Sequence, residues 1–202
     1  LRGMVARGIN AQTNKVHALI RQCFAFAVSE ERVAVNPALG IGAPAEQKAR
    51  TRVLADGELK ALWGALIDPA GLTKPHKPGE TPKPLGAGRA LRITLQLAML
   101  LLVRRAEVAG MRTDELDLEQ GVWLIPGERM KGGLPHAVPL SARAVALIEE
   151  ALKLRKDKTG VQVFQSFRGK DQPLLPNSVT HAMREITDAL EIKGVSPHDL
   201  RR

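Results

Sequence analysis

Apolar residues recur at helical spacing from about Asn10 to Arg32. They fall at i, i+3, i+4, i+7, i+8 and i+11 along one stripe, which comprises Val16, Leu19, Ile20, Cys23, Phe24 and Ala27. We expect Asn10 to cap the start of this helix. Val35-Asn36-Pro37 should end the region, because the residue before a proline is disfavoured in the α conformation. One helix cannot bury its own stripe, so the sequence should begin partway through a helical domain.

The next stretch predicts a linker followed by a helix and a long loop. Residues 40–52 combine Gly and Pro with a basic end, as linkers do. The helix that follows has Ala55 or Asp56 at its N-cap and one apolar face, made of Leu59, Leu62, Trp63 and Leu66. Residues 68–89 should lack regular structure because prolines interrupt them at Pro69, Pro75, Pro78, Pro82 and Pro84.

Residues 90–103 are apolar nearly all round, which predicts a buried central helix ending at Arg104 and Arg105. After this helix, the spacing of apolar residues changes from the helical period of 3.6 residues to the strand period of two. Three short strands are predicted around turns at Gly121 and Gly132-Gly133, over residues 116–118, 122–126 and 136–140.

The remaining third of the chain predicts two more helices. Ser141 should cap a helix whose inner face is Ala144, Leu147, Ile148, Ala151 and Leu152. Residues 161–167 should form a short strand or edge segment. Residues 177–190 should form a helix with an inward face of Val179, Met183, Ile186 and Leu190. Helices with one small antiparallel sheet indicate a mostly α, α+β fold.

The charge of the chain points to a polyanionic partner. Lys and Arg number 30 against 21 Asp and Glu, which gives a net charge of +9 and a pI near 10.1. Such a balance favours nucleic acid as partner; the alternative is a basic protein without one. Lys74, Lys77 and Lys83 make the proline-rich loop basic. We expect that loop to be a solvated, mobile insert, with contact to DNA as the alternative.

Cysteine content and hydropathy exclude several other classes of protein. Cys23 is the only cysteine, so a disulfide framework and a thiolate metal site are excluded, and we expect its thiol in the core. The most apolar run, residues 95–103, is far shorter than the roughly 20 residues that span a bilayer. No signal peptide is visible. A soluble, intracellular protein in a reducing compartment is predicted.

The last residues offer a candidate phosphate-binding turn. Ser196 can cap a helix, Pro197 suits its first turn and Asp199 stands three residues after the cap. His198 and Arg201 would share one face, at a helix end that already favours phosphate. An arginine adds a fork that matches phosphate oxygens. The alternative is an ordinary surface helix start.

Two further cations are candidates for the same chemistry. Arg104 follows an apolar run, and burying its stem is costly unless the guanidinium meets an anion. Glu107 could hold it; the alternative is a purely structural ion pair of Glu107 with Arg104 or Arg105. Lys131, beside the glycines of the hairpin, could protonate a leaving alkoxide, or could be a solvated turn lysine. His136 is expected to face solvent or backbone.

The order and spacing of these motifs resemble the tyrosine recombinases, in particular the phage-integrase branch found in bacterial prophages and genomic islands. The resemblance is carried by Val103-Arg104-Arg105-Ala106-Glu107, Val122-Trp123-Leu124-Ile125-Pro126, Glu128-Arg129-Met130-Lys131, Pro135-His136-Ala137-Val138-Pro139-Leu140-Ser141 and His198-Asp199-Leu200-Arg201-Arg202. Residues 14–27 and Asn36-Pro37 resemble the later part of that family's helical core-binding domain. The resemblance implies a core-binding remnant at 1–44 and a catalytic domain with a three-stranded antiparallel sheet at 45–202.

The resemblance also implies roles for individual residues. Arg104, Lys131, His198 and Arg201 would hold the scissile phosphate of double-stranded DNA, with Glu107 in support, while a tyrosine attacks to give a 3′-phosphotyrosyl intermediate. Neither a metal nor a cofactor is needed. Other basic residues are expected to contact DNA: Lys15, Arg50, Arg52, Arg105 and Arg202. Family members act as tetramers on attachment-site cores, in the bacterial cytoplasm and on the nucleoid.

Two features depart from the family pattern. Leu101-Leu102 stand where the family has Thr-Gly, just before the first arginine. The chain also contains no tyrosine. We therefore expect a fragment, truncated at both ends, that cannot cleave DNA although its parent is a site-specific recombinase. The alternatives are a non-catalytic DNA-binding module or remnant, and a metal-dependent nuclease, for which the predicted strands carry no carboxylate cluster.

Overall fold

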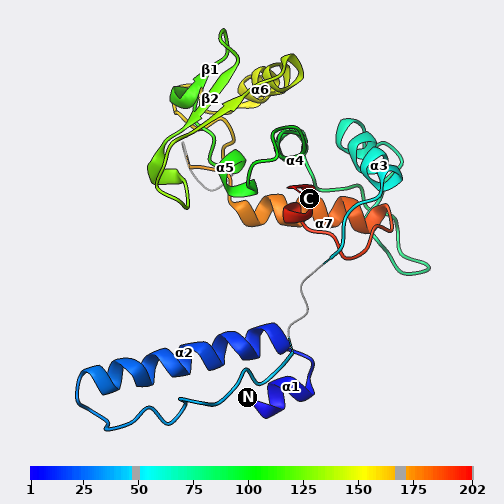
Figure 1. Cartoon of the computed structure of the whole chain (residues 1–202). Coiled ribbons are helices and arrows are strands. Elements are labelled where there is room, and N and C mark those ends of the chain that lie inside the picture. The colour runs from blue at the N-terminus through cyan, green and yellow to red at the C-terminus, as the bar shows by residue number, and fades with distance from the viewer. Residues whose placement is uncertain (47–50, 167–171, 202) are drawn as a thin grey trace. The chain divides into compact units, whose positions relative to one another are not determined.

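The computed structural model describes residues 1–46, 51–166 and 172–201. It divides into two compact units, Leu1–Thr51 and Arg52–Arg202 (Figure 1). The predicted contact residues Arg50 and Arg202 lie outside the described residues.

The first unit consists of two helices and a returning segment. Helix α1 spans Arg2–Ala6 and α2 spans Asn10–Ser29. Residues 33–46 run back along α2 (Figure 1). Asn36 Nδ2 donates to the carbonyl of Arg21 at 3.0 Å. Asn14 exchanges two hydrogen bonds with the backbone of Ala45, at 2.7 and 3.1 Å. Asparagine side chains therefore fix the segment on the helix.

Several predictions for α2 are wrong in detail. Leu19 and Cys23 are exposed, and the buried side chains of the helix are Thr13 and His17. Ile9, not Asn10, occupies the N-cap. The helix ends at Ser29 rather than Arg32, because Glu31 takes a left-handed φ of 54°. The amides of residues 31 and 32 then bond back to the carbonyls of Val28 and Ala27, a Schellman ending without the usual glycine.

The second unit is built around α4. The helices are α3 (Asp56–Ile67), α4 (Arg89–Leu101), α5 (Arg105–Ala109), α6 (Ala142–Leu154) and α7 (Pro176–Ala189). All the others pack against α4. Residues 93–98 of α4 are all buried, which confirms the predicted central helix. Two of its buried polar groups are hydrogen-bonded nearby: the Thr94 hydroxyl donates to the carbonyl of Ala90, and Oε1 of Gln96 accepts from Arg89.

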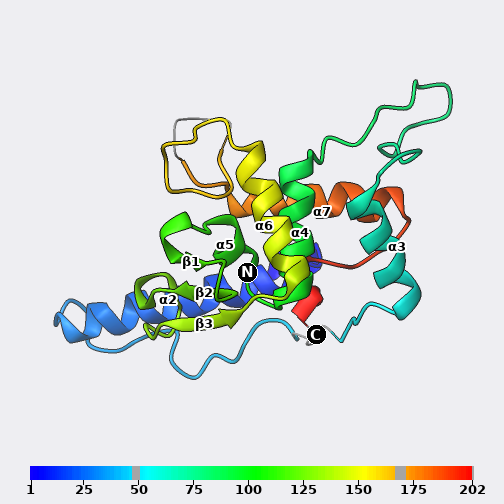
Figure 2. The same cartoon turned by 90° about the horizontal axis from the view of Figure 1, so that it is seen from above.

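The sheet is three-stranded and antiparallel, as predicted, and its strands Leu116–Asp117 (β1), Val122–Ile125 (β2) and His136–Pro139 (β3) pair in the order β1-β2-β3. Trp123 and Ile125 alternate with exposed Leu124 and are fully buried. The Ser141 hydroxyl accepts from the amide of Ala144, as expected of a cap. These elements confirm a mostly α, α+β fold. Figures 1 and 2 place α3 and the sheet on opposite sides of α4.

Two connecting segments differ in how they are held. The proline-rich loop before α4 is tied to α7, because Lys74 pairs with Glu185 at 2.9 Å and the amide of Gly86 donates to the same carboxylate at 2.6 Å. Within the described residues of the loop, Thr73 and Pro84 form an isolated antiparallel β-bridge. Residues 161–167 were predicted as a short strand or edge segment; residues 161–166 form no regular strand but pair through isolated bridges at Gln162 and Gln165, and Phe167 lies outside the described residues.

Candidate functional site

Arg104 stands at the turn between the central helix and α5. The turn reverses at Leu102, whose φ is 52°. Arg104 is the N-cap residue of α5, and the carboxylate of Glu107 accepts both its backbone N–H, at 2.6 Å, and its Nη1, at 2.7 Å. Glu107 is buried, whereas the Arg104 side chain remains 40% exposed. The carboxylate thus anchors the arginine and leaves part of its fork open to an anion.

Lys131 lines the same cavity as Arg104. This cavity of about 340 Å³, called here the Arg104 cavity, is lined by Arg104, Ala106, Glu107, Glu128, Arg129, Met130 and Lys131. The lysine comes from the connection between β2 and β3, after the 3₁₀ turn η2 (Gly127–Arg129). Two cations that are distant in sequence therefore meet at one concave surface.

Arg201 reaches the same turn from the other end of the unit. Its Nε donates to the carbonyl of Leu102 at 2.6 Å, two residues before Arg104. Arg201 belongs to η3 (Pro197–Arg201), a 3₁₀ turn that packs against α4. His198 is exposed on the same turn. Residues i and i+3 of a 3₁₀ turn lie one above the other, so His198 and Arg201 share a side.

The predicted cap of this last turn needs a correction. Asp199, not Ser196, supplies the capping oxygen: its buried carboxylate accepts from the Ser196 amide at 2.9 Å and from the Ser196 hydroxyl at 2.7 Å. The turn is 3₁₀ rather than the start of an α-helix. Its conformation is therefore held by one buried carboxylate.

The other predicted DNA contacts are placed differently. Arg52 is bound to Glu58; this hydrogen bond raises the pKa of the arginine and lowers that of Glu58. Arg105 is half-buried at the first position of α5. Lys15 is exposed on α2, in the first unit.

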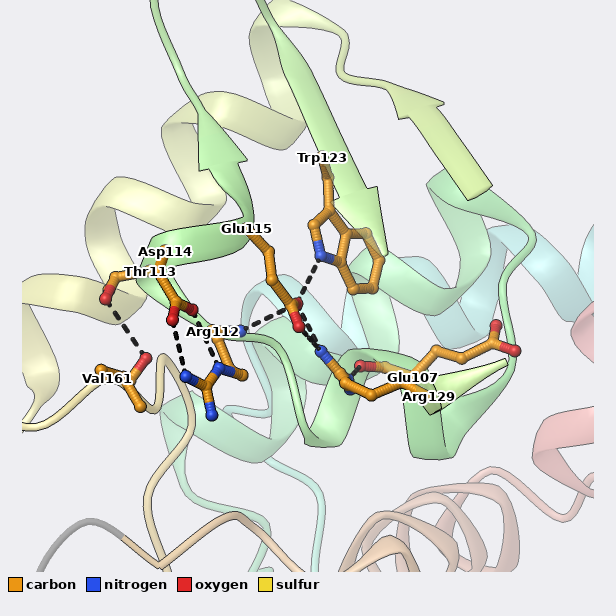
Figure 3. A network of polar contacts seen from close by, with 8 residues as sticks. All are labelled: Glu107, Arg112, Thr113, Asp114, Glu115, Trp123, Arg129 and Val161. Carbon is orange, nitrogen blue, oxygen red and sulfur yellow. Dashed lines mark hydrogen bonds and ion pairs between the residues drawn. The ribbon is translucent and has the colours of Figure 1, made fainter. Parts of the chain in front are cut away.

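A polar network beside the site was not predicted from the sequence, although Trp123 and Arg129 stand in motifs that carry the resemblance. Figure 3 shows Arg129 between the carboxylate of Glu115 and the carbonyl of Glu107, with Trp123 donating its indole N–H to Glu115 at 3.0 Å. One signal was available: the strand period turns Trp123 inward, and a buried indole N–H requires an acceptor. Periodicity alone could not name Glu115 as that acceptor.

The described residues contain no group of three His, Cys, Asp or Glu side chains placed to hold a metal ion. None of their helices combines the length and the apolar composition needed to cross a membrane.

Comparison of the sequence with known proteins gives several relatives. The prophage integrase IntZ of Escherichia coli K12 is 27% identical over 179 residues, which are 87% of this chain and 39% of that protein. The prophage integrase IntA of the same organism is 35% identical over 88 residues, 43% of this chain and 20% of that protein. The tyrosine recombinase XerD of Pseudomonas aeruginosa is 24% identical over 90% of this chain and 56% of its own length. The chain thus spans less than two thirds of the length of each of these relatives.

Solved structures show the same fold. A lambda integrase dimer bound to a COC′ core site matches with a TM-score of 0.71 at 18% identity, over 99% of this chain and 67% of that one. A Tn1549 transposon integrase in complex with circular intermediate DNA matches with a TM-score of 0.66 at 14% identity, over 98% of this chain and 66% of that one.

Residues 83–202, more than half of the chain, match the model of the phage integrase family. The chain belongs to the phage integrase family.

Proposed function

We propose that this chain carries the phosphate-binding part of a site-specific DNA recombinase. In the longer protein, a tyrosine would attack the scissile phosphate and form a phosphotyrosyl intermediate. The chain itself, which contains no tyrosine, would bind double-stranded DNA without cleaving it. Residues 1–44 would be the remnant of a core-binding domain, and residues from 45 onward the catalytic domain. The parent would act as an oligomer on DNA, as lambda integrase does in a tetramer bound to a Holliday junction.

One observation carries the proposal. Cations from three separate segments gather around one turn. Glu107 binds Arg104, Lys131 lines the Arg104 cavity, and Arg201 donates to the carbonyl of Leu102. Like charges repel, and a bound anion would offset the repulsion that remains beside the Glu107 carboxylate. A phosphodiester fits this arrangement, because arginine forks match its oxygens.

Each residue would have a distinct role in the chemistry. Arg104 and Arg201 would stabilise the charge that develops on the phosphate oxygens in the transition state. Lys131, on a flexible stem, would protonate the leaving oxygen, and His198 would assist from the exposed side of η3. Such electrostatic and acid–base catalysis requires no metal ion.

The first experiment measures binding to a short DNA duplex by fluorescence anisotropy at low salt. We expect the single substitutions Arg104→Ala, Lys131→Ala and Arg201→Ala each to weaken binding several-fold, because each phosphate contact adds about 0.9 to the log–log salt slope. Lys153→Ala, an exposed lysine in the last turn of α6, is the control and should change affinity less than twofold. Equal losses at all four positions would indicate unspecific attraction to a basic surface and would contradict the site.

The second experiment concerns cleavage. We expect no denaturant-resistant complex between this chain and nicked or suicide DNA substrates, because the proposed covalent intermediate requires a tyrosine. A recombinase that contains its tyrosine serves as the positive control. A clear adduct with this chain would reveal another nucleophile and overturn the phosphotyrosyl assignment.

A further inference from the structure

The carboxylate of Glu115 is a fixed point where three segments meet. It is buried, and it accepts the indole N–H of Trp123 at 3.0 Å from β2, the amide of Arg112 at 3.3 Å, and Nη1 of Arg129 from η2. A buried carboxylate is costly unless its oxygens are hydrogen-bonded, and here three donors share them. The position of Arg129 is therefore set by the core of the sheet, not by solvent.

Arg129 links the carboxylate of Glu115 to α5. Its Nη2 donates to the backbone carbonyl of Glu107 at 2.7 Å (Figure 3). The carboxylate of Glu107 in turn accepts from Nη1 of Arg104 at 2.7 Å. Arg129 also stands two residues before Lys131, and both line the Arg104 cavity. One guanidinium thus links the segment that carries Lys131 to the turn that carries Arg104.

Gly110 makes room for this guanidinium. A Cβ at position 110 would lie 3.0 Å from Nη2 of Arg129 and 3.3 Å from the carbonyl of Ala106. The φ of Gly110 is −97°, which any residue can adopt, so the backbone does not require glycine here. The absence of a side chain instead permits the close contact between Arg129 and the end of α5.

A direct contact between Arg129 and phosphate fits the geometry less well. The Arg129 side chain is 22% exposed, compared with 40% for Arg104. Both of its terminal nitrogens are already engaged, Nη1 by Glu115 and Nη2 by Glu107. Binding an anion would break contacts that satisfy a buried carboxylate.

We propose that Arg129 is a positioning residue for the candidate site. By bridging Glu115 and the Glu107 carbonyl, it sets the separation between Lys131 and Arg104, so that both cations can grip one phosphate. This inference rests on the proposed function, since the geometry matters only if the two cations share an anion. It is specific to arginine, because a lysine carries the charge but cannot offer two nitrogens in a planar fork.

The test is a double-mutant cycle on DNA affinity, measured where circular dichroism shows every variant folded. Arg129→Lys keeps the charge and should still weaken binding, but far less when Arg104 is already alanine. We expect a coupling of about fivefold or more in this cycle. Gly110→Ala, which crowds Nη2 without altering any charge, should reproduce the loss.

Arg89→Lys is the matched control. Arg89 also binds a glutamate through two nitrogens, Glu150 at 2.6 and 2.7 Å, and a backbone carbonyl, that of Leu66 at 3.1 Å. It should lower stability but combine additively with Arg104→Ala. If Arg129→Lys is also additive, or is silent while Arg104→Ala weakens binding, the positioning role is refuted. If neither Arg104→Ala nor Lys131→Ala weakens binding, the proposed function fails and the positioning role with it.

Discussion

At the scale of single residues, Leu102 holds an unfavourable conformation beside the candidate site. Its φ of 52° lies in the left-handed region, and its side chain is 55% exposed. For a residue with a Cβ this conformation costs roughly 1–2 kcal/mol. The family that the sequence resembles usually has glycine at this position, a residue that adopts the left-handed region without steric cost. In this chain a leucine takes the left-handed conformation, and its carbonyl accepts from Nε of Arg201.

Leu102→Gly should therefore raise the free energy of unfolding by up to about 1 kcal/mol, because the strain is relieved and little apolar burial is lost. Urea unfolding measures the change. Leu100→Gly is the control: it lies in α4, is partly exposed, and should cost about 1 kcal/mol. A loss at both positions would show that the conformation of Leu102 carries no strain.

Asp199 is the second residue whose substitution is informative. Asp199→Ala removes the oxygen that accepts from the amide and hydroxyl of Ser196, so we expect a loss of about 1–2 kcal/mol in thermal unfolding. Ser196→Ala, which removes only the hydroxyl, should cost less. DNA affinity should fall with Asp199→Ala, because η3 carries His198 and Arg201. Unchanged stability would mean that the buried carboxylate does not hold the turn.

At the scale of elements, Arg89 joins three helices. It stands at the first position of α4, binds Glu150 of α6 through two nitrogens, and donates to the last turn of α3 at Leu66. Arg92 donates to the carbonyls of Leu66 and Ile67, so two arginines satisfy the C-terminal end of α3. The hydrogen bond from Arg89 lowers the pKa of Glu150.

This lowered pKa predicts a pH dependence with a definite sign. The charged form of Glu150 is favoured in the folded state, so its contribution is complete above the unfolded pKa of about 4.3 and is lost as pH falls through the lower folded value. Glu150 is 41% exposed, so solvent screening limits the contribution to about 1 kcal/mol or less.

The melting temperatures of the wild type and of Glu150→Gln, measured from pH 7 to pH 3, provide the test. We expect the gap between them to be constant near neutrality and to close below about pH 4.3. Glu149→Gln, an exposed neighbour on α6, controls for the loss of a carboxylate from this helix. A gap that persists in acid would assign the effect to packing rather than to charge.

At the scale of the whole molecule, apolar burial is divided unequally. The large core cluster lies entirely in the second unit, from Leu54 to Leu200. Among the described residues of the first unit, Ala38 is the only fully buried apolar side chain. Leu19, Phe26, Val35 and Leu39 are all exposed there. Hydrophobic burial is the main favourable term in folding, so the two units should differ in stability.

We predict that residues 52–202 alone unfold in one cooperative transition, at nearly the melting temperature of the whole chain. Residues 1–51 alone should show no cooperative transition, since they lack an apolar core. Calorimetry of the two fragments makes the comparison. A large loss of stability in the 52–202 fragment would show that the first unit supports the second.

The sequence by itself determined the longer helices and the three strands of the second unit, and its structural class. Helices at α4, α6 and α7 and all three strands follow from the spacing of apolar residues, because their inward faces bury against one core. The residues of the candidate site were also proposed from the sequence, by their order and by the resemblance of their motifs, and their catalytic role stays a prediction. The stripe on α2 misled the prediction, since periodicity indicates which residues share a face but not whether anything covers it.

Only the tertiary structure decided how the candidate residues are held. Contacts between separate segments bring together Arg129, Glu115 and Gly110, and no local sequence pattern predicts such contacts. The left-handed conformations of Glu31 and Leu102 were also not predictable, because neither position holds the glycine that usually indicates such a conformation. The physical reason is that side-chain period and helix caps are local properties of the chain. Hydrogen bonds from a buried carboxylate, and the close approach of a guanidinium to a glycine, depend on which segments folding brings together.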